Sequence, residues 1–160
     1  MSDLNPLAVV IGYLWAVVVG GLAVPWVMRV IPAEQRDLGE RWNRSLIGLA
    51  ERLVAATATF LLSVELAAAW LVLKAAGNWG GWHDKPGVFN RFAFGTILSL
   101  AFGASGAVLA YALSHGEQAL GAGAVFGPLA LAGFAYSLCR GPHWWMHIWN
   151  EGAEESHASI

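Results

Sequence analysis

The chain has 160 residues, of which 57% are hydrophobic and only 12% are charged, whereas a soluble domain carries about 25% charged residues. Its formal net charge of -2 excludes a basic nucleic-acid-binding protein, and its single cysteine, Cys139, excludes an intrachain disulfide. The mean hydropathy of +0.53 favours a membrane protein. We therefore expect the lipid bilayer as a partner and no nucleic acid.

The apolar residues gather in four long stretches, at residues 7–31, 47–76, 89–113 and 120–138. A run of about 20 apolar residues spans a bilayer, and a segment in lipid must satisfy its own backbone groups, which favours helices. Short connections place consecutive helices antiparallel. The sequence thus predicts an all-α fold in which residues 1–160 form one transmembrane domain, an integral membrane four-helix bundle.

Two shorter helices are expected outside the spans. Residues 32–45 carry opposite charges four apart, which favours a short amphipathic connecting helix. Residues 142–151 place aromatic side chains on one helix face and polar ones on the other, which is typical of a C-terminal interfacial helix. Tryptophans anchor such segments at the membrane interface. The expected anchors are Trp42, Trp79, Trp82, Trp144, Trp145 and Trp149.

His143, His147 and Glu151 form a row at four-residue spacing on the polar face of this tail. Such a row can hold a metal ion, although no fourth ligand is indicated. Contact with a pigment or haem through a partner protein is another alternative. We favour the membrane anchor and predict neither a metal nor a cofactor, with bound lipid as the expected ligand.

Ionisable residues fall inside the second apolar stretch. Glu51 and Arg52 lie near its start and Glu65 near its middle, where a charge is costly and usually has a partner. Glu65 is either a coupling residue for protons or a neutral carboxyl that joins helices, and we favour the second. The candidate hydrogen-bond donors to it are Tyr13, Thr96, Ser99 and Tyr111. Lys74 is expected on a different helix face, with its amine reaching the membrane surface.

Small residues recur every four positions in the third and fourth stretches. They are Gly95, Ser99, Gly103 and Ala107 in the third, and Gly123 and Gly127, followed by Gly133, in the fourth. Stripes of this kind allow helices in a membrane to approach closely. We expect packing within the monomer, with packing against a second copy or another subunit as the alternative.

The basic residues decide membrane orientation only weakly if there are four spans. Five of them would lie on one side and four on the other, and the side richer in Lys and Arg is normally cytoplasmic. The arginine-rich first connection favours both termini outside, and both termini inside is nearly as well supported.

Residues 48–103 carry a sparse pattern of fixed points. It consists of ER at 51–52, LK at 73–74, an arginine at 91 and FGTILS at 94–99. The pattern resembles one in small, uncharacterised bacterial inner-membrane proteins with four spans. The resemblance implies a multi-pass protein of the bacterial inner (cytoplasmic) membrane, and it implies no activity.

The sequence shows no phosphate-binding loop, nucleophile elbow, HExxH helix or paired-cysteine metal site. We therefore predict a non-catalytic subunit or assembly factor of a larger membrane complex, with other membrane subunits or further copies of the chain as partners. One alternative is a small proton- or ion-coupled carrier that uses Glu65. Another is a lipid-modifying or metal-dependent membrane enzyme that uses His143, His147 and Glu151.

Overall fold

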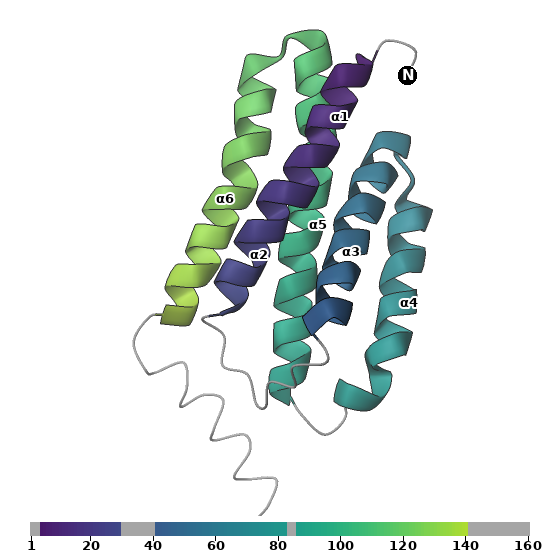
Figure 1. Ribbon diagram of the computed structural model, residues 1–160, viewed down its shortest axis with the longest axis vertical. Coiled ribbons are helices and arrows are strands. Elements are labelled where there is room, and N and C mark those ends of the chain that lie inside the picture. The colour runs from purple at the N-terminus through teal and green to yellow at the C-terminus, as the bar shows by residue number, and fades with distance from the viewer. Residues whose placement is uncertain (1–3, 30–40, 83–85, 141–160) are drawn as a thin grey trace, which may run out of the picture.

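A computed structural model describes residues 4–29, 41–82 and 86–140, and these residues form helices joined by short turns, with no strand among them. The helices lie alongside one another in an elongated bundle (Figure 1). The first long helix consists of α1 (Pro6–Leu14), a π-helical turn η1 (Trp15–Val19) and α2 (Gly20–Met28). The others are α3 (Arg41–Leu61), α4 (Val64–Trp82), α5 (Pro86–His115) and α6 (Gln118–Arg140).

Three of these helices are long and apolar enough to cross a membrane. The candidate spans are Pro6–Met28, Phe92–His115 and Gln118–Ser137. They match the first, third and fourth apolar stretches, so the all-helical fold is confirmed for the described residues, and three of the four expected spans are helices long and apolar enough to cross a membrane. The four-helix bundle is not confirmed, because the described residues form five long helices.

The difference lies in the second apolar stretch, which is a helical hairpin and not one helix. Leu62 has a φ of 50°, a left-handed conformation that ends α3. The Ser63 N–H bonds the Ala58 carbonyl at 2.9 Å, and the Leu62 N–H bonds the Thr59 carbonyl at 3.2 Å. These two bonds are those of a Schellman motif, which terminates a helix.

Ser63 then begins the next helix. Its hydroxyl accepts a hydrogen bond from the Leu66 N–H at 3.3 Å, as the N-cap residue of a helix does. α4 therefore runs back beside α3, and the two helices lie side by side (Figure 1). The hairpin adds one reversal to the chain.

That extra reversal changes where the two ends of the bundle lie. The start of α1 is at the end that also holds the α3–α4 and α5–α6 turns, which we call the turn end (Figure 1). α6 finishes at Arg140 at the opposite end. The start of α1 and the end of α6 thus lie at opposite ends of the bundle, whereas four antiparallel helices would bring them to the same end.

α5 is the central helix and contacts every other one. Glycines allow the closest approaches: a Cβ built on Gly106 would overlap the Gly12 carbonyl oxygen of α1, and one on Gly12 would overlap that of Gly106. The core lies further along α2 and α5 and includes Val27, Leu98 and Phe102, all nearly inaccessible. Close backbone contact at glycine is typical of helix pairs in membranes.

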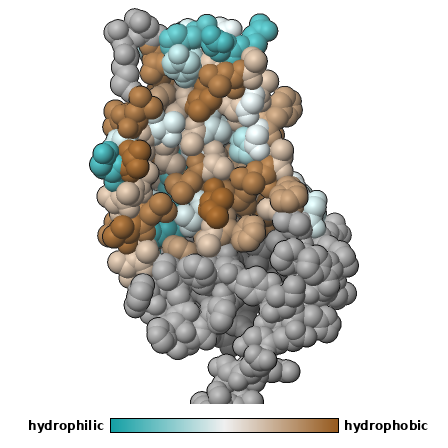
Figure 2. Space-filling model, turned by 180° about the vertical axis from the view of Figure 1, so that it is seen from behind, coloured by the Kyte–Doolittle hydropathy of each residue, from teal (hydrophilic) through white to brown (hydrophobic). Residues whose placement is uncertain are grey.

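The surface of the bundle is largely apolar between its ends. Figure 2 shows apolar side chains over most of one face and hydrophilic ones gathered at the turn end. Large side chains such as Leu22, Val72 and Phe134 are well exposed. A broad apolar belt with a polar end fits a chain surrounded by lipid.

Candidate functional site

Five polar side chains from three helices meet inside the bundle. They are Glu51 and Arg52 of α3, Lys74 of α4, and Thr96 and Ser99 of α5, and we call them the polar cluster. All are buried except Lys74, whose side chain is 10% exposed. At a rise of about 1.5 Å per residue, Glu51, Lys74 and Thr96 lie about 12 to 15 Å along their helices from the ends opposite the turn end. Their equal depth explains why the three side chains meet.

Lys74 is the centre of the cluster. Its amine forms an ion pair with the Glu51 carboxylate, donates to the Thr96 hydroxyl at 2.6 Å and lies 4.5 Å from the centre of the Phe92 ring. Thr96 in turn donates to the Phe92 carbonyl at 2.8 Å. The expectation that the Lys74 amine reaches the membrane surface from a separate face is therefore wrong, because the hairpin turns Lys74 toward Glu51.

Arg52 is the less satisfied cation. Its Nη1 lies 3.5 Å from the Ser99 hydroxyl, a long contact, and Ser99 donates to the Gly48 carbonyl at 3.3 Å. Its Nε has no hydrogen-bond partner among the described residues. The Arg52 side chain passes against Gly20 of α2, where a Cβ would lie 2.7 Å from its Cδ. The cluster thus holds two cations and one carboxylate away from water.

Glu65 is far from this cluster. It lies in the first turn of α4 at the turn end, exposed to solvent, and its carboxylate accepts a hydrogen bond from Ser63 at 3.1 Å. Its own backbone N–H, followed by the Ser63 hydroxyl, holds the pKa of the carboxyl below its usual range. A continuous helix over residues 47–76 would place Glu65 near its middle, whereas the turn at Leu62 places it at the start of a new helix.

The four candidate donors to Glu65 have other partners. Tyr13 bonds the Thr57 hydroxyl of α3 at 2.8 Å, and Tyr111 stacks on His115. Thr96 and Ser99 belong to the polar cluster. A contact that was not expected joins the Trp15 indole to Ser105 of α5 at 3.0 Å.

The small-residue stripe of α5 packs inside the monomer. Ser99, Gly103 and Ala107 are buried, and a Cβ on Gly103 would lie 2.5 Å from the Ala55 Cβ of α3. Gly95 has more room, with Met28 at 3.6 Å. The closest approach, at Gly106, was not among the expected positions.

The stripe of α6 behaves differently. Nothing in the described part of the chain lies within 4 Å of a Cβ built on Gly123, Gly127 or Gly133. The inward face of α6 is formed instead by Ala124, Ala132 and Ala135. The α6 glycines therefore face outward, away from the rest of the bundle.

The histidine row and the tail lie outside the described residues: His143, His147, Glu151, Trp144, Trp145 and Trp149. Most of the expected connecting helix lies outside them as well. Trp42 falls near the start of α3, and Trp79 and Trp82 near the end of α4, so all three belong to one end of the bundle. Within the described ranges, no three His, Cys, Asp or Glu side chains converge as metal ligands.

The chemistry open to the polar cluster is limited. The Glu51 carboxylate and the Lys74 amine are already in contact, so they can exchange a proton or hold helices together. The open groove along α2 and the one beside the α3–α4 turn include no residue of the cluster. The geometry supports a structural role in which the cluster holds α3, α4 and α5 together.

A scan of protein-family models gives no match to the chain, and searches of curated proteins and of solved structures give none either.

Proposed function

We propose that the protein is a non-catalytic subunit or assembly factor of a larger membrane complex. The observation that carries this proposal is the outward glycine face of α6, defined by Gly123 and Gly127, where an added Cβ meets nothing within 4 Å among the described residues. A glycine in a helix costs roughly 0.5 to 1 kcal/mol relative to alanine. The α5 glycines compensate for that cost by close packing within the monomer, whereas the α6 glycines have no such contact there.

A helix of another subunit is the occupant that this face fits. Without a hydrophobic driving force in lipid, helices associate through small residues that let backbones approach. Gly123 and Gly127 are four residues apart and therefore lie on one helix face. Exposed Phe134 lies on the same face one to two turns further along and can add apolar contact.

Purification in mild detergent from the native membrane, followed by native mass spectrometry, tests the proposal. We expect one defined complex with another membrane protein, and loss of that partner when Gly123 and Gly127 are both changed to Leu. The matched control is Ala122→Leu, which enlarges another exposed position of α6 and should leave the complex intact. Recovery of the wild type only as a monomer, or as copies of itself alone, would contradict the proposal.

A small proton-coupled carrier is the second candidate, and the buried Glu51–Lys74 pair is the observation that favours it. Ionisable groups at membrane depth often mark ion pathways. In this reading the coupling carboxylate is Glu51 and not Glu65, which is exposed at the turn end. The test is pH-driven proton flux into vesicles containing the purified protein. A carrier predicts flux that Glu51→Gln abolishes and Glu65→Gln preserves, and no flux in the wild type removes this candidate.

A further inference from the structure

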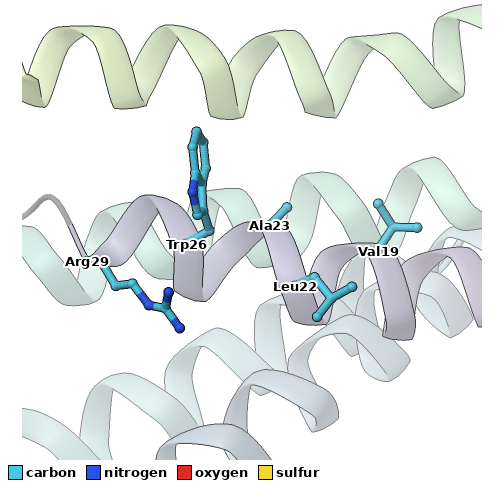
Figure 3. A pocket seen from close by; sticks show the side chains of 5 residues that line it. All are labelled: Val19, Leu22, Ala23, Trp26 and Arg29. Carbon is cyan, nitrogen blue, oxygen red and sulfur yellow. The ribbon is translucent and has the colours of Figure 1, made fainter.

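A shallow open groove follows the outward face of the first long helix at the end of α2. It is lined by Val19, Leu22, Ala23, Trp26 and Arg29. In Figure 3, Val19 and Ala23 point to the same side as Trp26, which stands toward α6, whereas Leu22 and Arg29 project to the other side. The lining is apolar except for the Arg29 guanidinium and the Trp26 indole N–H. An apolar groove with one cation at its end matches the chemistry of a lipid with an anionic head group.

The Trp26 wall of the groove is held in place. Its ring stacks on the Tyr136 ring of α6, with centroids 4.3 Å apart and planes 10° from parallel. Leu22 on the opposite side is 73% exposed, so the groove is open to the surrounding medium along its length. Within a membrane, that medium is the acyl region of the lipid. Aromatic side chains such as that of Trp26 lie near the head groups when they are at the interface.

Arg29 lies at the end of the bundle that carries the positive charge. The described helix ends there contain Arg29, Arg41, Arg44, Arg91 and Arg140, and Arg52 and Lys74 lie in the same half. In the sequence, Arg36 lies between α2 and α3, and Lys85 lies between α4 and α5. The turn end contains Glu65 and Glu117 and no described Lys or Arg. We call the positively charged end the basic end.

We infer that the α2 groove binds an acidic phospholipid, with an acyl chain against Val19, Leu22 and Ala23 and the phosphate beside Arg29. Two independent features support this assignment: the apolar groove ends at an exposed arginine, and that arginine lies at the end where the Lys and Arg residues collect. Leaflets rich in anionic lipid attract such segments. The inference requires the bundle to be in a membrane but does not depend on its being a subunit.

Native mass spectrometry of the full chain tests the lipid site. The protein is released from bilayers that contain equal amounts of phosphatidylglycerol and phosphatidylcholine. We expect retained phosphatidylglycerol to exceed phosphatidylcholine, and Arg29→Gln to lower that preference about fivefold, the effect of removing one basic residue at a membrane surface. Arg29→Lys should keep most of it. Leu22→Ala, at a position exposed enough to spare the fold, should lower retention of both lipids.

The matched control is Arg44→Gln, which removes a positive charge from α3 at the same end, whereas Arg29 follows α2. An equal loss of preference in Arg29→Gln and Arg44→Gln would overturn the inference, because it would show attraction by the end as a whole. Displacement of the lipid by millimolar inorganic phosphate would overturn it too, since the acyl chain would then contribute nothing. Retention of phosphatidylglycerol by a monomer with no partner would support the lipid site while contradicting the subunit proposal.

Discussion

Glu51 and Lys74 are each costly to bury alone, and their contact makes burial tolerable. Lys74→Met would leave the Glu51 carboxylate unpaired, and breaking a buried pair in this way commonly costs about 3 to 5 kcal/mol. The double variant Glu51→Gln, Lys74→Met should lose less than Lys74→Met, because no carboxylate is then left unpaired; the loss that remains is that of the negative charge near buried Arg52. Equilibrium unfolding in detergent measures both. Additive losses, with the double variant the least stable, would show that the two groups do not interact.

Glu65 makes stability depend on pH at the turn end. Its pKa is lowered by its backbone N–H and by Ser63, so its contribution is present above the ordinary carboxyl value of about 4.3 and is lost as the pH falls through the lower folded value. We therefore expect the melting temperature of the wild type to exceed that of Glu65→Gln at pH 7, and the difference to shrink as the pH falls below the ordinary carboxyl value. A difference that does not change with pH would mean that the carboxylate is not stabilised in the fold.

At the scale of the helices, Leu62 decides whether residues 47–76 are one helix or two. Leu62 is 83% exposed and has a positive φ, so Leu62→Gly removes little packing and relieves a conformation that costs about 1 to 2 kcal/mol for an L-residue. We expect the variant to be more stable in equilibrium unfolding. In a continuous helix the same change would destabilise by about 1 kcal/mol. Leu61→Gly, within α3, is the control that should destabilise.

The glycines of α5 and α6 should respond in opposite ways to the addition of one methyl group. Gly106→Ala would place a Cβ against the Gly12 carbonyl, and overpacking of this kind costs about 1 to 3 kcal/mol. Gly127→Ala meets open space and should stabilise the monomer by up to about 1 kcal/mol. Thermal unfolding of the purified monomer decides between these outcomes. An unchanged midpoint for Gly106→Ala would place the α1–α5 crossing elsewhere.

The sequence was sufficient for the three candidate spans because each is one apolar run of ordinary length. It was not sufficient for the hairpin, because Leu62 is a residue that rarely ends a helix. Two signals were nevertheless present. The stretch 47–76 is longer than the about 20 residues that a span needs, and Ser63 followed by Glu65 resembles a helix start. Glu51 and Lys74 lie equally far from that turn, so a hairpin at Leu62 predicts that the two side chains lie side by side.

For the whole molecule, the hairpin strengthens the prediction of orientation. Four spans would divide the Lys and Arg residues almost evenly, whereas five antiparallel helices place the described ones in the half that contains the basic end. The positive-inside rule then predicts that the basic end is cytoplasmic and that the turn end is outside. We test this in a Cys139→Ser background with a membrane-impermeant maleimide. Glu117→Cys should react in intact cells and Arg29→Cys only after permeabilisation. The reverse pattern would contradict the assignment.

We propose that the chain functions through its outward α6 face and that its buried charges are structural. Site-specific photo-crosslinking in living cells tests the role of the α6 face, with a photoreactive residue at position 127 and, as control, at the position of exposed Val72 of α4. We expect one protein adduct from position 127, containing the same subunit that co-purifies with the wild type, and no such adduct from position 72. Lipid adducts alone at both positions would contradict it.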